Sequence, residues 1–217
     1  MKYQTLFFYM RIRRREVLHS NDLLTIETMP SWSDISLALY KEFSEQYLIP
    51  TIFRYYLENG EIIDVRFEEW AIYHILGIQH INGKISKTKF FEEIENGLDL
   101  DSFMENKKLK KRLNDFKHRI RMFGCIYQIM KDEELFYIKD KQLKDSSVKA
   151  DYIKYALIDN KGANVGIRYF ENQYIAYTML IDRSINPAAT VEGLIPIRIE
   201  KLEIIRDGEI VETIVHK

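Results

Sequence analysis

The spacing of hydrophobic residues changes near residue 131, and this change limits what the chain can fold into. Between residues 106 and 131, apolar side chains recur every three or four positions, as they do along one face of an α-helix. After residue 134, short β-prone segments alternate with turn signals instead. The sequence therefore predicts an α+β fold, in which N-terminal helices pack on a largely antiparallel C-terminal sheet.

Helix start and stop signals divide the first half of the chain. Ser33 is a candidate N-cap for a helix that Pro50 terminates, and Gly77 is a candidate left-handed cap for a second helix. The expected helices cover residues 34–48, 67–78, 86–96 and 106–131.

Turn signals place the strands. Asn59-Gly60 between two β-prone runs predicts a hairpin over residues 54–66. Residues 3–12 and 22–28 are also compatible with strands. A break near residue 50 divides the chain into an N-terminal extension, 1–50, and a main domain, 51–217. The expected C-terminal strands cover residues 135–139, 153–159, 165–171, 174–181, 197–205 and 209–215.

Composition narrows the class of protein. The 217 residues carry a net charge of −1 and a single cysteine, Cys125, so an internal disulfide and a cysteine-based zinc site are excluded. No apolar run approaches the ~20 residues of a spanning helix. We therefore expect a soluble, cytoplasmic protein without membrane contact. Nucleotide-binding motifs and metal-ligand spacings are absent from the sequence, so we expect no cofactor and no metal.

The helix predicted over residues 106–131 is strongly basic. Eight of the fifteen residues from 107 to 121 are cationic, and only Asp115 opposes them. Contact with nucleic-acid phosphates would explain this excess. A solvated helix, neutralised by acids from elsewhere, would also explain it. The first interpretation assigns nucleic-acid binding to Lys107, Lys108, Lys110, Lys111, Arg112 and Arg121.

His74 is the candidate for proton transfer. It falls on the apolar face of the helix predicted over residues 67–78, and histidine titrates near neutral pH. A buried histidine bonded to a carbonyl would fit this position equally well. His80 is the reserve candidate. The discriminating observation is whether His74 opens into a cleft or lies sealed in the core.

The hairpin over residues 56–67 is followed by Trp70 and the motif His74-Ile-Leu-Gly-Ile78. This order resembles a phage-associated nuclease family of the barnase–EndoU–colicin–RelE-like superfamily, whose members carry a hairpin and a histidine-containing helix. Residues 90–103, FFEEIENGLDLDSF, are similar to the segment that follows in the family. Downstream, residues 151–154 and 174–180 match a lysine strand and a threonine strand, although Ala176 and Tyr177 replace the family's proline and asparagine.

The resemblance implies a helix-then-sheet fold and a metal-independent endoribonuclease of phage, toxin or host-defence type. His74 would transfer the proton, Lys154 and Arg168 would bind phosphate, and Thr178 would orient it. As strand residues, Lys154 and Arg168 could instead face solvent, and Thr178 could serve cross-strand packing. The implied partners are RNA and an immunity or antitoxin protein. The alternative function is a non-catalytic nucleic-acid- or protein-binding module on the same fold.

Overall fold

The computed structural model describes residues 18–138, 149–182 and 194–216. It begins with short helical segments, and the strand expected over residues 3–12 lies outside the described residues. The strand expected over 22–28 is wrong, because the His19 N–H donates to the Asp22 carboxylate at 2.8 Å and starts a 3₁₀ turn there. These first segments are η1 (Ser20–Leu24), η2 (Trp32–Asp34), α1 (Leu37–Phe43) and the π-helical turn η3 (Ser44–Leu48).

The remaining helices follow a β-hairpin. The helix predicted over residues 106–131 is two helices, α6 and α7, which separate at Gly124 and Cys125. A Cβ at Gly124 would lie 2.8 Å from the Pro30 ring, so this close approach requires glycine. The six helices are α2 (Glu69–Leu76), α3 (Ile78–Ile81), α4 (Phe90–Glu95), α5 (Leu100–Met104), α6 (Lys107–Phe123) and α7 (Ile126–Lys131).

The strands of the described residues form one eight-stranded sheet in the order β1-β2-β6-β5-β4-β3-β7-β8. The predicted hairpin is confirmed as β1 and β2, with Gly60 at φ +80° in its turn. The strands are β1 (Thr51–Leu57), β2 (Ile62–Arg66), β3 (Glu134–Ile138), β4 (Tyr152–Ile158), β5 (Lys161–Phe170), β6 (Gln173–Asp182), β7 (Leu194–Arg206) and β8 (Glu209–Val215).

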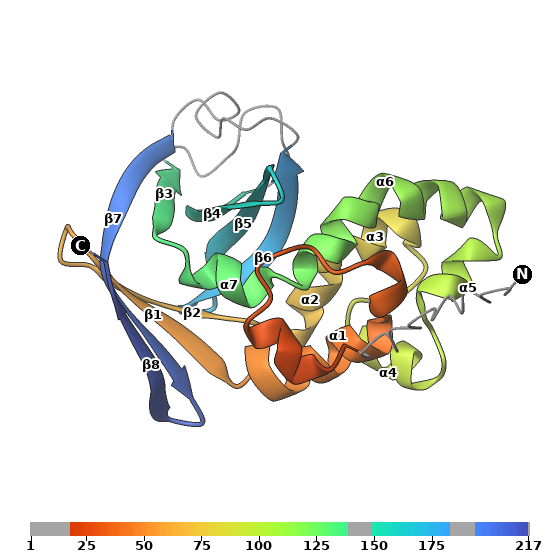
Figure 1. Ribbon diagram of the computed structural model, residues 1–217, viewed down its shortest axis with the longest axis horizontal. Helices are drawn as coiled ribbons and strands as arrows, with labels where there is room; N and C mark the ends of the chain where they lie inside the picture. The colour runs from red at the N-terminus through yellow and green to blue at the C-terminus, as the bar shows by residue number, and fades with distance from the viewer. Residues whose placement is uncertain (1–17, 139–148, 183–193, 217) are drawn as a thin grey trace, which may run out of the picture.

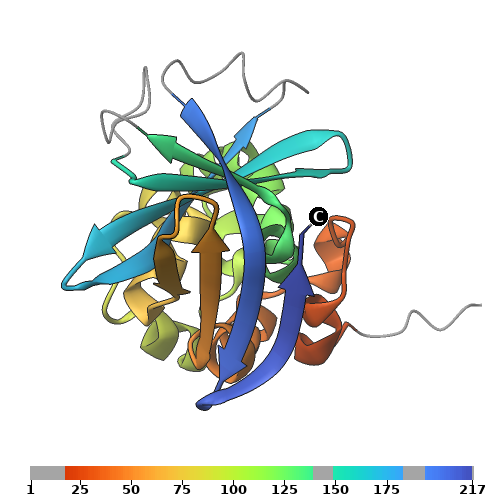
Figure 2. The same cartoon turned by 90° about the vertical axis from the view of Figure 1, so that its left-hand side faces the viewer.

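The helices and the sheet confirm the predicted α+β class, but the sheet closes into a mixed barrel instead of the simple, largely antiparallel sheet that was predicted. Strand β1 pairs with β7 as well as β2, and this second pairing links the first strand of the series to the next-to-last one and closes the sheet, while β8 pairs with β7. The β2–β6 pairing, through Val65 and Arg66, is parallel, whereas the others are antiparallel. Figure 2 shows β1, β7 and β8 side by side on one wall of the barrel. The hydrophobic pattern predicted the strands. Strand β1 and its partner β7, however, are more than 140 residues apart in the sequence, and no local sequence signal indicates their pairing.

The helices lie beside the barrel and share one hydrophobic core with it. Figure 1 shows α1 to α6 on one side and the strands on the other, with α7 between them. Leu37, Tyr40 and Phe43 of α1 are fully buried in the same core as Phe53 of β1. The division of the chain at residue 50 stays a prediction, although the two parts pack together.

Candidate active site

Helix α2 positions His74 against the barrel. Ala71, Ile72 and Ile75 are fully buried, and α2 packs on strand β6. Gly77 ends the helix at φ +78°, which confirms the predicted left-handed cap. His74 itself is only partly buried, so its ring is not sealed in the core.

The ring of His74 opens into a cleft of about 410 Å³ between α2, the loop before α4, and the β5–β6 hairpin. Two exposed cations line this cleft, Lys87 from the loop and Arg168 from β5. Its other lining residues are Trp70, Thr88, Phe170, Glu171, Ile175 and Tyr177. A proton-transfer group, two cations and a hydroxyl therefore meet in one partly apolar hollow, as in many ligand sites.

A β-bulge brings Tyr177 to this cleft. On β6, Ala176 pairs with Ile167 and Thr178 pairs with Gly166, so Tyr177 is the extra residue between two regular pairs. Bulges of this kind redirect a side chain and are frequent beside active sites. The Tyr177 and His74 ring centroids are 6.4 Å apart.

Burial lowers the pKa of His74, and the charges of Lys87, Arg119 and His80 lower it further. The imidazole is consequently neutral at neutral pH, which is the form that accepts a proton. His80 is exposed and stacks on Phe116 with ring centroids 5.0 Å apart. It lies outside the residues that line the cleft.

Arg119 of α6 fixes the end of α2 that carries His74. Its guanidinium donates to the backbone oxygens of His74 and Ile75, the latter at 2.7 Å. These carbonyls form the negative end of the helix dipole, so a cation stabilises them. Arg119 is 7% exposed, and burial lowers its pKa to about 10. Arg119 thus holds the backbone of His74 in place and adds positive charge behind the cleft.

Lys154 does not share this cleft. Its ammonium is fully buried, donates to the backbone oxygens of Asp132 and Glu134, and lies 5.4 Å from the Tyr55 ring centroid. Burial lowers the pKa of Lys154 to about 7. The strand period pointed to either solvent or phosphate for this side chain, whereas the barrel closes over it.

Thr178 does not line this cleft either. It is 6% exposed, and a Cβ at Gly166 would lie 2.6 Å from its methyl group, so the two residues pack together across the strands. Of the four predicted catalytic residues, the structure brings His74 and Arg168 together and separates Lys154 and Thr178 from them. Sequence reasoning missed Lys87, and it counted Tyr177 only among the hydroxyls that could orient a phosphate oxygen, not among the predicted catalytic residues.

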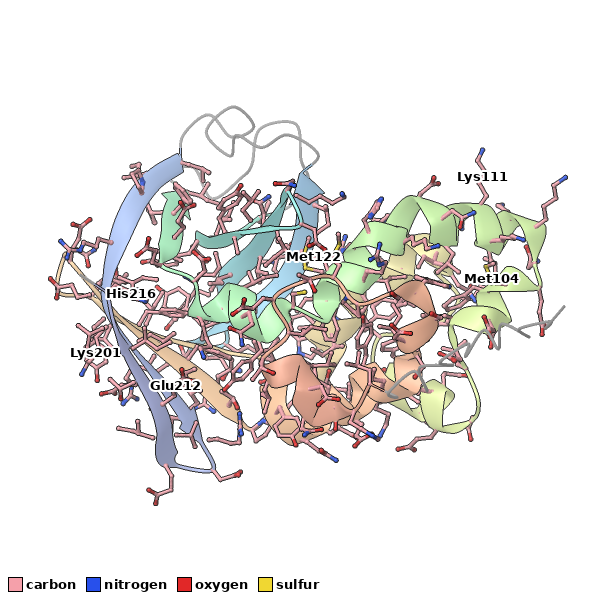
Figure 3. The ribbon with its side chains drawn as sticks, viewed as in Figure 1. Met104, Lys111, Met122, Lys201, Glu212 and His216 are labelled. Carbon is pink, nitrogen blue, oxygen red and sulfur yellow. The ribbon has the colours of Figure 1, made fainter. Side chains whose placement is uncertain are left out.

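The predicted nucleic-acid-binding residues of α6 divide into two groups. Lys107, Lys108, Lys110, Lys111 and Arg112 are exposed, and Figure 3 shows Lys111 extending away from the molecule. Arg121 instead donates to the backbone oxygens of Pro30, at 2.7 Å, and Met29, at 3.3 Å. The exposed patch therefore comprises the first five residues. Arg121 instead holds the segment of chain around Met29 and Pro30 against α6.

Among the described residues, no three His, Cys, Asp or Glu side chains gather to form a metal site. Among the helices described above, none combines the length and apolar character needed to cross a membrane.

Comparison with known proteins gives one match. The sequence model of a family described as phage-Barnase-EndoU-ColicinE5/D-RelE like nuclease4 (PBECR4) matches residues 36–192. The match contains α2, the loop before α4, and the β5–β6 hairpin, which together form the cleft. No curated protein and no solved structure matches the chain.

Proposed function

The chain belongs to this phage-associated nuclease family, and from that premise we propose that it is a metal-independent endoribonuclease whose active site is the His74 cleft. The observation that carries the proposal is the meeting of His74, Lys87 and Arg168 in one hollow. RNA carries its own nucleophile, the 2′-hydroxyl, so its cleavage requires only proton transfer and stabilisation of charge on the phosphorane.

Each group has a role that its surroundings support. The neutral His74 imidazole takes the proton of the 2′-hydroxyl while the 2′-oxygen bonds to phosphorus. The bond from phosphorus to the 5′-oxygen breaks, and the Tyr177 hydroxyl supplies a proton to that leaving oxygen. Lys87 and Arg168 hold the negative phosphoryl oxygens, which is the service a metal ion would otherwise supply. Lys154 and Thr178 are left out of this mechanism because they lie elsewhere.

The exposed patch on α6 supports a nucleic-acid substrate. Its five cations belong to the same helix whose Arg119 holds the end of α2. At ~1.5 Å per residue, they lie roughly 10–18 Å along the helix from Arg119. A strand that leaves the cleft toward this end of α6 would meet them within a few nucleotides.

The biological setting that fits such an enzyme is a phage or mobile-element toxin, or a host-defence nuclease, acting in the cytoplasm. An uncontrolled ribonuclease would damage the cell that makes it, so an immunity or antitoxin protein is part of the proposal.

The direct test is cleavage of bulk RNA in the presence of a chelator. We expect His74→Ala to reduce the cleavage rate by about 10²–10⁴-fold, the usual contribution of a general base. His80→Ala is the matched control, since His80 lies outside the cleft. Lys87→Gln should slow cleavage while Lys84→Gln, an exposed lysine of the same loop, should not.

Full cleavage by folded His74→Ala would remove this residue from the mechanism. Tight RNA binding without cleavage by the wild-type protein would instead favour the non-catalytic binding module. Cleavage that disappears in chelator and returns with a divalent ion would contradict metal independence.

A further inference from the structure

We infer that the cleft accepts an unstacked base on the exposed ring of Phe170, beside Trp70, and that the protein therefore selects single-stranded over duplex RNA. This inference rests on the proposed function and names its substrate class. Phe170 ends β5 and is 39% exposed, although it lines the same hollow as His74. Isolated exposed aromatic residues are ordinary, but one beside a phosphate-binding group is a stacking surface for bases.

The ring of Phe170 is held in place from behind. Its centroid lies 5.8 Å from that of Trp70, and the two planes meet at 63°. Lys87 lies 5.0 Å from the Trp70 centroid, so a cation is available on the same wall for the phosphate next to the base. Aromatic rings and cations interleaved in this way are typical of sites for single-stranded nucleic acid.

The hairpin that carries Phe170 is tied to α2. Gln173, the residue paired with Phe170, donates its side-chain amide to the Glu68 carboxylate at 3.1 Å. Glu68 is the residue immediately before α2. The hairpin that carries the stacking surface and the helix that carries His74 are therefore linked through a hydrogen bond. Because the two elements are already held together, less conformational entropy is lost when RNA binds.

Duplex RNA cannot use such a surface. Within an A-form helix the faces of the bases are covered by their neighbours, and a protein reaches only the backbone and the shallow groove. A base must leave the stack to lie on Phe170, which a single strand permits at low cost. The arrangement thus favours single strands without reading their sequence.

The test separates stacking from catalysis by using an oligonucleotide that cannot be cleaved. A short 2′-O-methyl single strand and the corresponding blunt duplex are titrated by fluorescence anisotropy. We expect the single strand to bind more tightly to the wild-type protein. Phe170→Leu should weaken that binding roughly 5- to 100-fold, the effect of removing one base–aromatic stack, and should leave duplex binding nearly unchanged.

Tyr169→Leu is the matched control. Tyr169 is 50% exposed and adjacent in sequence, but it lines a different hollow with Arg54 and Tyr56. In a Trp32→Phe background, Trp70 is the one remaining tryptophan, so quenching of its emission by the single strand reports on the cleft directly.

Equal effects of Phe170→Leu and Tyr169→Leu, equal binding of single strand and duplex, or failure to bind the single strand would each overturn the inference. Catalysis is scored separately. If the protein binds single strands selectively and the His74→Ala variant still cleaves RNA at the full rate, only the proposed role of His74 is contradicted. Loss of cleavage in His74→Ala with no dependence of binding on Phe170 would contradict only the stacking surface.

Discussion

At the scale of single residues, the surroundings of His74 determine which proton-transfer role it can take. Burial and three nearby cationic or ionisable side chains all disfavour the imidazolium form, so the pKa of His74 lies below 6.5. A group of this kind is ready to accept a proton at neutral pH and is a poor initial proton donor. We therefore assign it the general base.

The first prediction concerns the pH dependence of cleavage. Because a general base must be deprotonated, kcat/KM should rise with pH through the lowered pKa of His74 and level off above it. Lys87→Gln removes a charge that lowers this pKa, so the rising limb should move to higher pH. Lys84→Gln should not move it. A profile that falls across the same range would contradict the assignment of His74 as base.

Lys154, unlike His74, is fully buried. No carboxylate of the described residues forms a hydrogen bond or an ion pair with its side chain. Its hydrogen bonds go to two backbone oxygens, while Asp132, Glu133 and Glu134 act on it only through their charges. Burial, and after it the charge of Lys154, lowers the pKa of His216. Desolvation outweighs these charges, so the pKa of Lys154 falls from 10.5 to about 7.

The second prediction follows from that pKa. Between about pH 7 and 10.5 the unfolded chain binds a proton at Lys154 that the folded chain does not, so this residue makes the free energy of unfolding rise with pH. Lys154→Met should reduce that slope by up to ~1.4 kcal/mol per pH unit, as measured by urea unfolding at pH 7, 8 and 9. Lys110→Met, at an exposed position, is the control. An unchanged slope would show that Lys154 is charged when buried.

At the scale of elements, the two halves of α6 differ in burial and in charge. Its C-terminal half is buried through Ile120, Met122 and Phe123, and it carries Arg119. Its first turn contains no acidic residue, and it places Lys107 and Lys108 at the positive end of the helix dipole. Asn106 accepts hydrogen bonds from the first free N–H groups, which offsets part of this cost. Cations that oppose the dipole reduce stability, and the proposed contact with nucleic acid is a reason for them to be there.

The third prediction tests this trade-off. The double substitution Lys107→Glu and Lys108→Glu should stabilise the fold by roughly 0.5–2 kcal/mol, because carboxylates suit a helix N-terminus. The same change should weaken single-stranded RNA binding and reduce the slope of log K against log salt by about 1.4. The control is the double substitution Lys84→Glu and Lys149→Glu, which changes the net charge by the same amount at exposed positions outside α6. Equal loss of binding in both double variants would show that the exposed patch on α6 does not bind RNA and is only a solvated helix face.

At the scale of the whole molecule, residues 18–50 form part of the folded unit. The Tyr40 hydroxyl donates to the Ile120 oxygen, the Leu37 N–H donates to Asp99, and Met29 donates to Asp159. These bonds connect the segment to α6, to the residue before α5 and to the β4–β5 turn. The helix that carries Arg119 is therefore packed partly by residues outside the predicted main domain.

The fourth prediction concerns that dependence. A chain that begins at Thr51 should lose the cooperative thermal transition of the full chain, because it exposes the core surfaces that Leu37, Tyr40 and Phe43 cover. Near-ultraviolet circular dichroism and a melting curve would measure the loss. A sharp transition in the shorter chain would instead establish residues 1–50 as a separable extension.

Local sequence signals were enough to predict most helices and strands and to single out His74 as the candidate catalytic residue. Hydrophobic period, turn residues and caps are short-range signals, so they placed the β1–β2 hairpin, α2 with its Gly77 cap, and the C-terminal strands. A motif around His74 was enough to indicate the nuclease family. Barrel closure depends instead on contacts between distant segments, as does the burial of Lys154 and the arrival of Lys87 and Tyr177 beside His74. Only the tertiary structure decides these, because a side chain's solvent exposure and partners depend on what folds over it.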